Sequence, residues 1–439
     1  MAREMKDSGI EWIGEIPVHW NLVPFYRLVD QVSDSIVDGP FGSDMKNEEY
    51  VDAGVPVIQL GAIKENGMDF SKMHFISDSK ADILRRHNAF PFNLAIAKMM
   101  PAGRCCEIPD KFERYVVSAD VIRASVSNAV LRHFLNYAFN TYIKVWANAE
   151  TSGSTRARIN IEKLKKFKFA LPDQNEMEFI LNKLDRECAK IDKAVEATKA
   201  SIEEYKKLRQ AIITEAVTKG LDPNVEMKDS GVEWIGEIPF HWNARPIKNS
   251  FTIVSGSTPN SDKSEYWDGD IPWITPADFK TLDKITSGGS RFITKEGYNS
   301  CSTNMIPKGS IIFSKRAPIG SVVINSVDLC TNQGCLSCIK NEKTDSTYFY
   351  YVMSIFVDVF NLYGSGTTFK EISATAFGDV ILPLPPILEQ KHIASLLDTK
   401  CSEIDSLIKS KEKLIEELTA YRKSLIFEYV TGKKEVPAV

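Results

Sequence analysis

The chain has 439 residues, 43% of them hydrophobic and 26% charged, which is the composition of an ordinary folded protein with more than one domain. No run of about 18 apolar residues occurs, which argues against a membrane span. Neither an apolar N-terminal core nor a dense cysteine framework indicates secretion, so we expect a cytoplasmic protein. The net charge of −4 does not favour nucleic-acid binding, which usually leaves a basic footprint.

The chain begins with a block, Met5–Asn21, that returns almost unchanged as Met227–Asn243. Only two positions differ between MKDSGIEWIGEIPVHWN and MKDSGVEWIGEIPFHWN, and such a repeat decides architecture before any other signal. Each copy holds two tryptophans, which can bury a large area on a small structure. Each also holds one histidine, which we expect to be packed and hydrogen-bonded rather than reactive. These residues are Trp12, His19 and Trp20 in the first copy and Trp234, His241 and Trp242 in the second.

The region after each block shows short apolar runs separated by Gly, Pro, Asn and Asp, such as Val55–Leu60 and Ile311–Lys315. Each region also holds one helical stretch, at about 128–149 and 346–362. We therefore expect two mixed domains with a mainly antiparallel sheet, an α/β (α+β) fold. Weak similarity marks the domains as diverged copies of one fold. The matching residues are Lys98, Pro101, Gly103 and Ser152–Thr155 in the first and Lys315, Pro318, Gly320 and Ser365–Thr368 in the second.

A long helical segment follows each domain, and Leu171–Lys219 aligns without gaps on Leu384–Gly432. Apolar residues recur there with a period of about 3.5, which predicts the seam of a coiled coil. About 40 residues at 1.5 Å each would make a rod of roughly 60 Å, and two rods related by pseudo-two-fold symmetry would pack antiparallel and hold the domains apart. The equivalent Cys188 and Cys401 are expected to be small buried hydrophobes rather than a disulfide or metal pair. The seam residues are Ile180, Leu184, Ile191, Val195, Ile202 and Tyr205 in the first segment and Ile393, Leu397, Ile404, Ile408, Ile415 and Leu418 in the second.

Three patterns that resemble reactive sites fail on closer inspection. Gly364–Lys370 differs from a phosphate-binding loop because phenylalanine replaces the glycine before its lysine and no Ser or Thr follows. Pro172-Asp173 with Glu204–Lys206 has the residue types of a nuclease, but most of them lie on the coiled-coil helix. The pair Cys335 and Cys338 has no second pair and no neighbouring histidines, so core cysteines are favoured over zinc. We therefore expect no catalytic residues and no metal ligands, and recognition rather than reaction.

Three motifs together resemble the specificity subunit of type I restriction–modification systems over the whole chain. MKDSG(I/V)EWIGEIPxHW occurs twice, and LPPILEQKHI at Leu384–Ile393 precedes the second helix. The first helix leaves through VTKGLD at Val217–Asp222 into the second block. The first pre-helix copy, LPDQNEMEFI, departs from the usual Pro-Pro-x-x-Glu-Gln form, so the motif does not give the start of that helix.

The resemblance implies two target-recognition domains that read the two halves of an asymmetric, bipartite site in double-stranded DNA. It also implies two methyltransferase (M) subunits docked on the helices, and restriction (R) subunits in the full complex. S-adenosylmethionine, ATP and Mg would belong to those partners, while this non-catalytic chain would bind no cofactor. The implied segments are a conserved block at 1–21, recognition domain 1 at 22–170, spacer helix 1 at 171–220, a linker with the repeated block at 221–243, recognition domain 2 at 244–383, spacer helix 2 at 384–433 and a tail at 434–439.

Candidate DNA contacts are polar residues on loops, because base edges and phosphates are reached by Arg, Lys, amides, hydroxyls and backbone N–H groups. Gly/Ser loops near the start of each domain could bring the backbone to a phosphate, although plain turns explain them equally well. Gln59 and Thr275 are further candidates. The principal candidates are Ser43, Lys98, Ser154, Thr155, Arg156 and Arg158 in the first domain and Ser257, Thr258, Lys315, Arg316, Thr367, Thr368 and Lys370 in the second.

Two other classes of protein remain as alternatives. A coiled-coil scaffold that binds proteins or carbohydrates would explain the repeats and the helices. It would not explain near-identical blocks beside strongly diverged domains, a contrast that fits two constant docking units carrying two separate readers. An enzyme with an unrecognised site would show activity without partner subunits.

Overall fold

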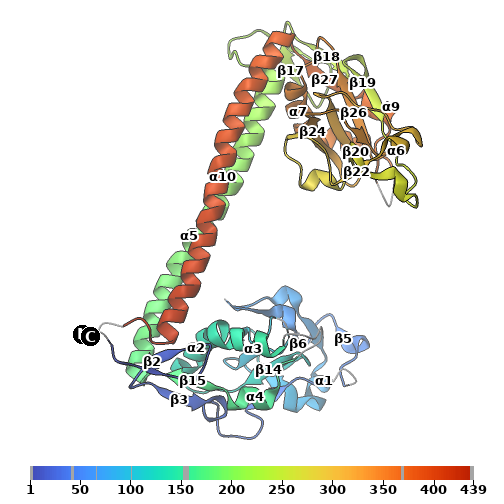
Figure 1. Cartoon of the computed structure of the whole chain (residues 1–439). Coiled ribbons are helices and arrows are strands. Elements are labelled where there is room, and N and C mark those ends of the chain that lie inside the picture. The colour runs from blue at the N-terminus through green and yellow to red at the C-terminus, as the bar shows by residue number, and fades with distance from the viewer. Residues whose placement is uncertain are drawn as a thin grey trace. The chain divides into compact units, whose positions relative to one another are not determined.

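The computed structural model describes residues 3–40, 44–65, 67–99, 101–151, 158–366 and 370–435. Its internal contacts divide the chain into two units, one formed by Met1–Thr198 with Lys413–Val439 and the other by Lys199–Glu412. Each unit combines one repeated block, one sheet-rich domain and parts of both long helices (Figure 1). Among the described residues, no helix is both long and apolar enough to cross a membrane.

Each repeated block folds as a small antiparallel hairpin whose second tryptophan is fully buried, since Trp20 and Trp242 are both 0% exposed. The strand that leaves the block pairs with the last strand of the following domain, directly before the long helix. A domain is therefore inserted between the block and the helix, and both of its ends lie in one strand pair. The strands are β1 (Met5–Asp7), β2 (Glu15–Pro17), β3 (Asn21–Pro24) and β15 (Lys168–Leu171) in the first unit, and β16 (Met227–Asp229), β17 (Glu237–Pro239), β18 (Asn243–Pro246) and β27 (Ile381–Leu384) in the second.

The first domain holds a five-stranded sheet in the order β10-β13-β6-β9-β5 and a four-stranded sheet in the order β12-β11-β14-β4. Most strand pairs are antiparallel, and β13 runs parallel to β6. Its strands are β4 (Ile36–Asp38), β5 (Tyr50–Val51), β6 (Val55–Ile58), β7 (Ile63–Lys64), β8 (Gly67–Met68), β9 (His74–Ile76), β10 (Asn88–Ala89), β11 (Leu94–Ala97), β12 (Cys105–Glu107), β13 (Tyr115–Val117) and β14 (Val121–Ala124). Its helices are α1 (Asp78–Ile83), α2 (Ala129–Ala138), α3 (Lys144–Thr151) and α4 (Ile161–Lys166).

The second domain also has two sheets, a five-stranded sheet, β19-β26-β23-β24-β21, and a three-stranded sheet, β22-β20-β25. The parallel pair of β20 with β25 corresponds to β6 with β13. The mixed, mainly antiparallel fold expected from the sequence is thereby confirmed. The strands are β19 (Phe251–Ser255), β20 (Trp267–Ile274), β21 (Ile285–Thr286), β22 (Arg291–Ile293), β23 (Ile311–Lys315), β24 (Ile319–Asn325), β25 (Cys330–Thr331) and β26 (Cys335–Lys340). The helices are α6 (Lys295–Asn299), α7 (Ser346–Ile355), α8 (Val357–Leu362) and α9 (Ala374–Asp379).

The two long helices, α5 (Gln174–Lys219) and α10 (Ile387–Val430), pack side by side (Figure 1). The start of α5 meets the end of α10 in the first unit, and the end of α5 meets the start of α10 in the second. This is the expected antiparallel pair. The seam positions from Ile180 to Tyr205 and from Ile393 to Leu418 are all buried or half-buried.

The helix starts differ between the units. In α10 the buried Gln390 donates from Nε2 to the carbonyls of Pro385 (2.8 Å) and Lys343 (2.9 Å), and its Oε1 accepts from the Asp345 N–H (2.8 Å). The equivalent residue in α5 is the buried Met177. There the carboxylate of Asp173 caps the helix by accepting from the Glu176 N–H. The departure of LPDQNEMEFI from the usual motif thus replaces a buried amide by an apolar side chain.

Both long helices end at a glycine with positive φ, Gly220 (+77°) and Gly432 (+70°). A Cβ at Gly220 would lie 3.2 Å from the Trp242 ring, and one at Gly432 would lie 2.4 Å from Pro17. The left-handed conformation and the close approach together account for glycine at these two C-terminal caps. Each helix end is therefore packed directly onto a repeated block.

Candidate nucleic-acid interface

In the first domain, three chain segments meet just after the end of β11. The Lys98 N–H donates to the Asp120 carbonyl (2.8 Å), and the Lys98 carbonyl accepts from the Ile159 N–H (2.9 Å). The Lys98 side chain, 15% exposed, forms an ion pair with Asp38. The Arg158 Nε donates to Asp120 Oδ1 (2.8 Å), and the Arg158 side chain is 51% exposed. We call this meeting point the first junction, and both of its predicted cations have an acidic partner.

The second domain builds the same junction at the end of β23. The Lys315 N–H donates to the Gly334 carbonyl (3.0 Å), and the Lys315 carbonyl accepts from the Ile372 N–H (3.0 Å). The Glu371 carboxylate binds both cations, with Lys315 Nζ at 2.8 Å and Arg316 at 3.4 Å. The hydrogen bond from Lys315, with Arg316 close by, holds the pKa of Glu371 below its usual value. We call this the second junction.

The backbone frame of the two junctions is the same, but the charges are exchanged between segments. Glu371 stands directly before Ile372, where Arg158 stands before Ile159, and Gly334 stands where the first junction has Asp120. Lys370 is exposed beside Glu371. The first junction has no net charge, because two cations, Lys98 and Arg158, face two carboxylates, Asp38 and Asp120. The second has a net positive charge, because Lys315, Arg316 and Lys370 face only Glu371.

The glycine loops that open each domain pack against their own sheet. A Cβ at Gly39 would lie 2.2 Å from the Ser118 carbonyl, and one at Gly256 would lie 2.0 Å from the Thr331 carbonyl. The Ser257 N–H also donates to the Thr331 carbonyl (2.9 Å). Close approach within the domain therefore accounts for these glycines, and the expected approach to a phosphate is not needed to explain them.

Beside the glycine loop of the second domain, the Thr258 hydroxyl donates to Oε1 of Gln333, an exposed residue in the turn between β25 and β26. The sequence contained no signal for Gln333, because a single glutamine in a polar loop does not differ from many others. The contact arises only when β19 and β25 are brought together.

Of the two further candidates, Gln59 lines a pocket and Thr275 stabilises a loop. Gln59 lines a pocket of about 340 Å³ together with Tyr50 and Asp120, next to the first junction. Thr275 donates from both its N–H and its hydroxyl to the buried Asp278 (2.8 Å each), so it shapes a loop. Six principal candidates lie outside the described residues: Ser43, Ser154, Thr155, Arg156, Thr367 and Thr368.

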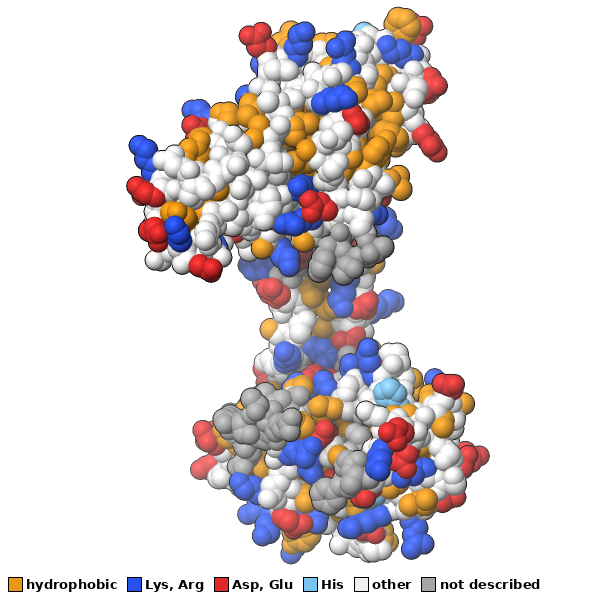
Figure 2. All heavy atoms as spheres, turned by 90° about the vertical axis from the view of Figure 1, so that its right-hand side faces the viewer, with side chains coloured by type: hydrophobic (Ala, Val, Ile, Leu, Met, Phe, Trp, Pro, Cys, Tyr) orange, Lys and Arg blue, Asp and Glu red, His pale blue; other side chains and the backbone are white. Residues whose placement is uncertain are grey.

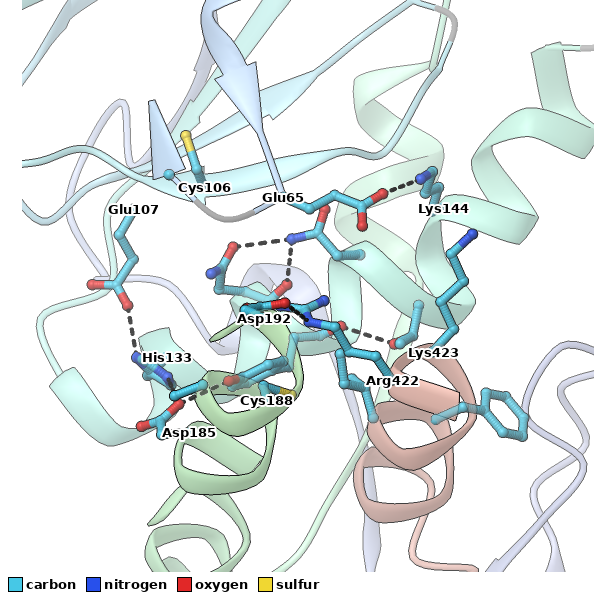
Figure 3. Close-up of a pocket in the computed structure, with 18 of the residues that line it drawn as sticks. Glu65, Cys106, Glu107, His133, Lys144, Asp185, Cys188, Asp192, Arg422 and Lys423 are labelled. Carbon is cyan, nitrogen blue, oxygen red and sulfur yellow. Dashed lines mark hydrogen bonds and ion pairs between the residues drawn. The ribbon is translucent and has the colours of Figure 1, made fainter. Parts of the chain in front are cut away.

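A second pocket in the first unit, of about 710 Å³, lies where the domain meets α5 and α10 (Figure 3). His133 on α2 contacts two carboxylates there, Asp185 of α5 at 2.9 Å and Glu107 of β12 at 3.3 Å. The Tyr137 hydroxyl donates to the same Asp185 (2.8 Å). The hydrogen bond with Glu107, helped by Asp185, raises the pKa of His133. This group of residues is called the first clamp, because it ties the domain to the helix.

The second unit has an equivalent clamp, in which Lys284 from the segment directly before β21 takes the role that His133 on α2 has in the first. Lys284 forms an ion pair with Asp398 of α10, and the Tyr351 hydroxyl of α7 donates to the same carboxylate (2.6 Å). Burial, with the bond to Asp398, raises the pKa of Tyr351. Asp185 and Asp398 are equivalent in the aligned helices, so the carboxylate and the tyrosine are common to both clamps.

The repeated histidines tie each block to the start of a long helix. His19 Nε2 lies 2.9 Å from Glu176, and His241 Nε2 lies 2.8 Å from the equivalent Glu389. The rings are hydrogen-bonded as expected, but with side chains 51% and 49% exposed they are less packed than the motif suggested. The buried Trp20 also donates to Glu176 (3.0 Å).

The four cysteines considered in the sequence analysis all lie in the interior. Cys188, Cys401, Cys335 and Cys338 are buried free thiols, and burial raises the pKa of each. Within the described part of the chain, no group of three or more His, Cys, Asp or Glu side chains could hold a metal ion. On the face seen in Figure 2, basic and acidic side chains are interspersed on both units. That face therefore shows local groups of basic side chains and not one extended basic surface.

Comparison with known proteins gives consistent matches. A family model described as the type I restriction modification DNA specificity domain matches residues 42–206 and 239–420. The MjaIX specificity subunit of a type I restriction enzyme from Methanocaldococcus jannaschii is 38% identical over 182 residues, which are 41% of this chain and 41% of that relative. The putative MjaX specificity subunit from the same organism is 24% identical over 443 residues, covering 97% of this chain and 96% of that relative.

Two solved structures share the fold. A chain from a structure described as the structural basis of complex assembly and conformational transition of the type I R-M system has a TM-score of 0.73 at 14% identity, covering 95% of this chain and 99% of that one. The HsdS subunit from Thermoanaerobacter tengcongensis has a TM-score of 0.54 at 14% identity, covering 95% of this chain and 98% of that one. At this identity the likeness concerns the fold alone.

Proposed function

The chain belongs to the type I restriction–modification DNA specificity family, and we propose that residues 22–170 and 244–383 are two recognition domains that each read one half of an asymmetric, bipartite DNA site. The protein is the non-catalytic DNA specificity subunit of such a system, with two target-recognition domains. We call the remaining segments the constant frame, which consists of 1–21, 171–220, 221–243 and 384–433. Residues 434–439 are a tail.

One observation supports this division above the others. The two junctions keep the same main-chain hydrogen bonds from Lys98 and Lys315, while the side chains around them differ in type and charge. A common frame with different polar side chains suits two readers of different sequences. Because base identity is read by hydrogen bonds to base edges, such a difference gives two unlike half-sites.

The junction residues would contact DNA by exchanging partners. In the first junction, Lys98 would leave Asp38 and Arg158 would leave Asp120 for a phosphate or a base. In the second, Lys315 and Arg316 would leave Glu371 in the same way. Exposed Lys370 would contact a phosphate directly. The Arg158–Asp120 pair is partly exposed, and surface ion pairs stabilise a fold by only about 0–1 kcal/mol, so its exchange for a phosphate costs little.

Two methyltransferase subunits would dock on the constant frame, one on each block-and-helix unit, and restriction subunits would join the full complex. The two blocks expose apolar side chains at equivalent positions, Val18 (39%) and Phe240 (60%), which suits repeated docking. S-adenosylmethionine, ATP and Mg would be bound by those partners and not by this chain. The assembly would work on DNA in the cytoplasm.

The test is long-read methylation mapping of DNA from cells that carry this gene with its methyltransferase partner, compared with a deletion of this gene. We expect a bipartite, asymmetric adenine-methylation motif that disappears on deletion. Replacing residues 22–170 by the corresponding domain of a relative should change one half of the motif and leave the other. An unchanged methylation pattern with the methyltransferase expressed would contradict the proposal.

A further inference from the structure

The turn between β25 and β26 is hydrogen-bonded at both ends and presents one side chain outward. The Asn332 N–H donates to the Ile274 carbonyl (2.9 Å), and the Asn332 Oδ1 accepts from the Gly334 N–H (2.8 Å). The Gly334 carbonyl accepts from Lys315 in the second junction (3.0 Å). Asn332 is half-buried and Gly334 is buried, so Gln333 at the tip is the exposed residue of the three.

The Gln333 amide is oriented by its bond from the Thr258 hydroxyl. Its Oε1 accepts that bond with one lone pair, which leaves the second lone pair and both amide hydrogens for a ligand. Fixing a flexible side chain before binding lowers the entropy cost of recognition. In the major groove, adenine offers N7 as an acceptor and N6 as a donor, the pattern that one glutamine amide matches with two hydrogen bonds.

The surroundings of Gln333 suit a duplex. Lys315 and Arg316 belong to the strand end that holds the turn, and Lys370 is exposed in the neighbouring segment. Cations that contact phosphates fix the position of a reader but carry no sequence information, whereas an amide at the tip of a turn can reach a base edge. The first junction has Ala119 in the position of Gln333, so that position carries no amide there.

From this geometry we propose that Gln333 is a specificity-determining residue that reads an adenine in the half-site of the second domain. Thr258 is its positioning residue, because it fixes the amide without contacting the base. This inference rests on the proposed function of residues 244–383 as a recognition domain. It adds the base class and the residue that reads it.

The first experiment maps adenine methylation in cells that express the partner methyltransferase with wild-type chain or Gln333→Ala. One position of one half-site, occupied by A on the strand that is read, should become degenerate. Discrimination against the other bases at that position should fall by roughly 5- to 150-fold, the loss of one bidentate contact. Gln31→Ala is the matched control, because Gln31 is an exposed glutamine of the first domain, so the half-site of the second domain should stay unchanged.

A second variant separates loss of recognition from loss of folding. Gln333→Glu keeps the shape and the acceptor but removes the amide donor, and a carboxylate accepts from cytosine N4. The same position should therefore shift from A towards C, a change that partial unfolding cannot produce. Thr258→Val, which removes only the hydroxyl, should relax the same position by less than Gln333→Ala.

The outcomes distinguish the two levels of the proposal. A wild-type motif that depends on this gene, together with an unchanged motif in Gln333→Ala and Gln333→Glu, overturns the role of Gln333 and leaves the recognition function intact. Degeneracy spread over both half-sites also overturns it, because a base contact acts at one position. If the wild type gives no gene-dependent motif, the recognition function itself fails.

Discussion

The two junctions have the same backbone and opposite arrangements of charge. In the first, Asp120 in the turn pairs with Arg158 in the neighbouring segment, and in the second a glycine occupies the turn and Glu371 supplies the carboxylate. Main-chain donors and acceptors are the same for every non-proline residue, so the frame survives while side chains change. The comparison teaches that the domains conserve the placement of their loops and vary what the loops present.

The constant frame shows the reverse behaviour. The pairs Arg422–Asp192 (2.9 Å) and Arg209–Asp405 (3.1 Å) are equivalent in the two units, as are the tyrosine–aspartate bonds of the clamps. The clamps differ in one partner, since His133 comes from α2 and Lys284 from the segment directly before β21. These isolated differences allow one half of the chain to serve as the control for the other.

The largest expected effect concerns the buried start of α10. Gln390→Met removes the partner of three backbone groups, at Pro385, Lys343 and Asp345. Each buried group left without a hydrogen bond costs about 1–3 kcal/mol, so we expect at least about 3 kcal/mol of destabilisation, measured by chemical unfolding. Since Met177 occupies the equivalent site in α5, an unaffected Gln390→Met variant would show that the two helix starts are interchangeable.

The buried tryptophans give a smaller contrast. Trp20 Nε1 donates to Glu176, whereas Trp242 Nε1 has no partner among the described residues. Tryptophan to phenylalanine shrinks the ring equally in both blocks but breaks a hydrogen bond only in the first. We expect Trp20→Phe to cost about 1 kcal/mol more than Trp242→Phe in calorimetric unfolding. Equal losses would mean that the bond to Glu176 contributes nothing.

Freeing the junction cations should strengthen DNA binding unequally. Glu371→Gln releases Lys315 and Arg316, whereas Asp120→Asn releases only Arg158. Each cation that gains a phosphate should steepen the dependence of log affinity on log salt by about one. We therefore expect a larger increase in low-salt affinity for Glu371→Gln, measured by fluorescence anisotropy on the assembled methyltransferase. Weaker binding by both variants would remove the junctions from the DNA interface.

The smallest effect is a pH dependence confined to the first clamp. His133 lies between Glu107 and Asp185, Arg132 also binds Glu107, and Tyr137 also binds Asp185. Because its folded pKa is raised above 6.5, its contribution is complete below that value and is lost as the pH rises through the raised pKa. The melting temperature should fall slightly on going from about pH 6 to 9.

His133→Gln should abolish the part of this fall in melting temperature that comes from the titration of His133. The second clamp gives the internal comparison, because Lys284 stands there in the role of the histidine. If the wild type and His133→Gln change in parallel with pH, the contact with His133 does not stabilise the first unit.

Much of the architecture could be predicted because its signals are local. The repeated blocks and the helical period each depend on a few neighbouring residues. The family resemblance added the division into two recognition domains. The exposure of His19 could not be foreseen, since a motif shows that a residue is constrained and not which side of it meets water.

The candidate site was only partly accessible to prediction. Lys98, Arg158, Lys315 and Arg316 could be selected as cations on loops, but their neutralisation by acidic partners could not. Gln333 was missed altogether, because its proposed role depends on Thr258 in the loop after β19, far away in the chain. Ser257 could be selected, yet the fold uses its N–H within the sheet.

The sequence by itself determined two repeated blocks, two antiparallel helices and two diverged domains, because periodicity and repetition are properties of the order of residues. The tertiary structure alone decided which charges cancel and which amide faces outward. Lys98 and Asp38 are far apart in the chain, as are Gln333 and Thr258, and each pair meets only after the strands between them have paired. Contacts between distant segments depend on the closure of those segments, which no local pattern encodes.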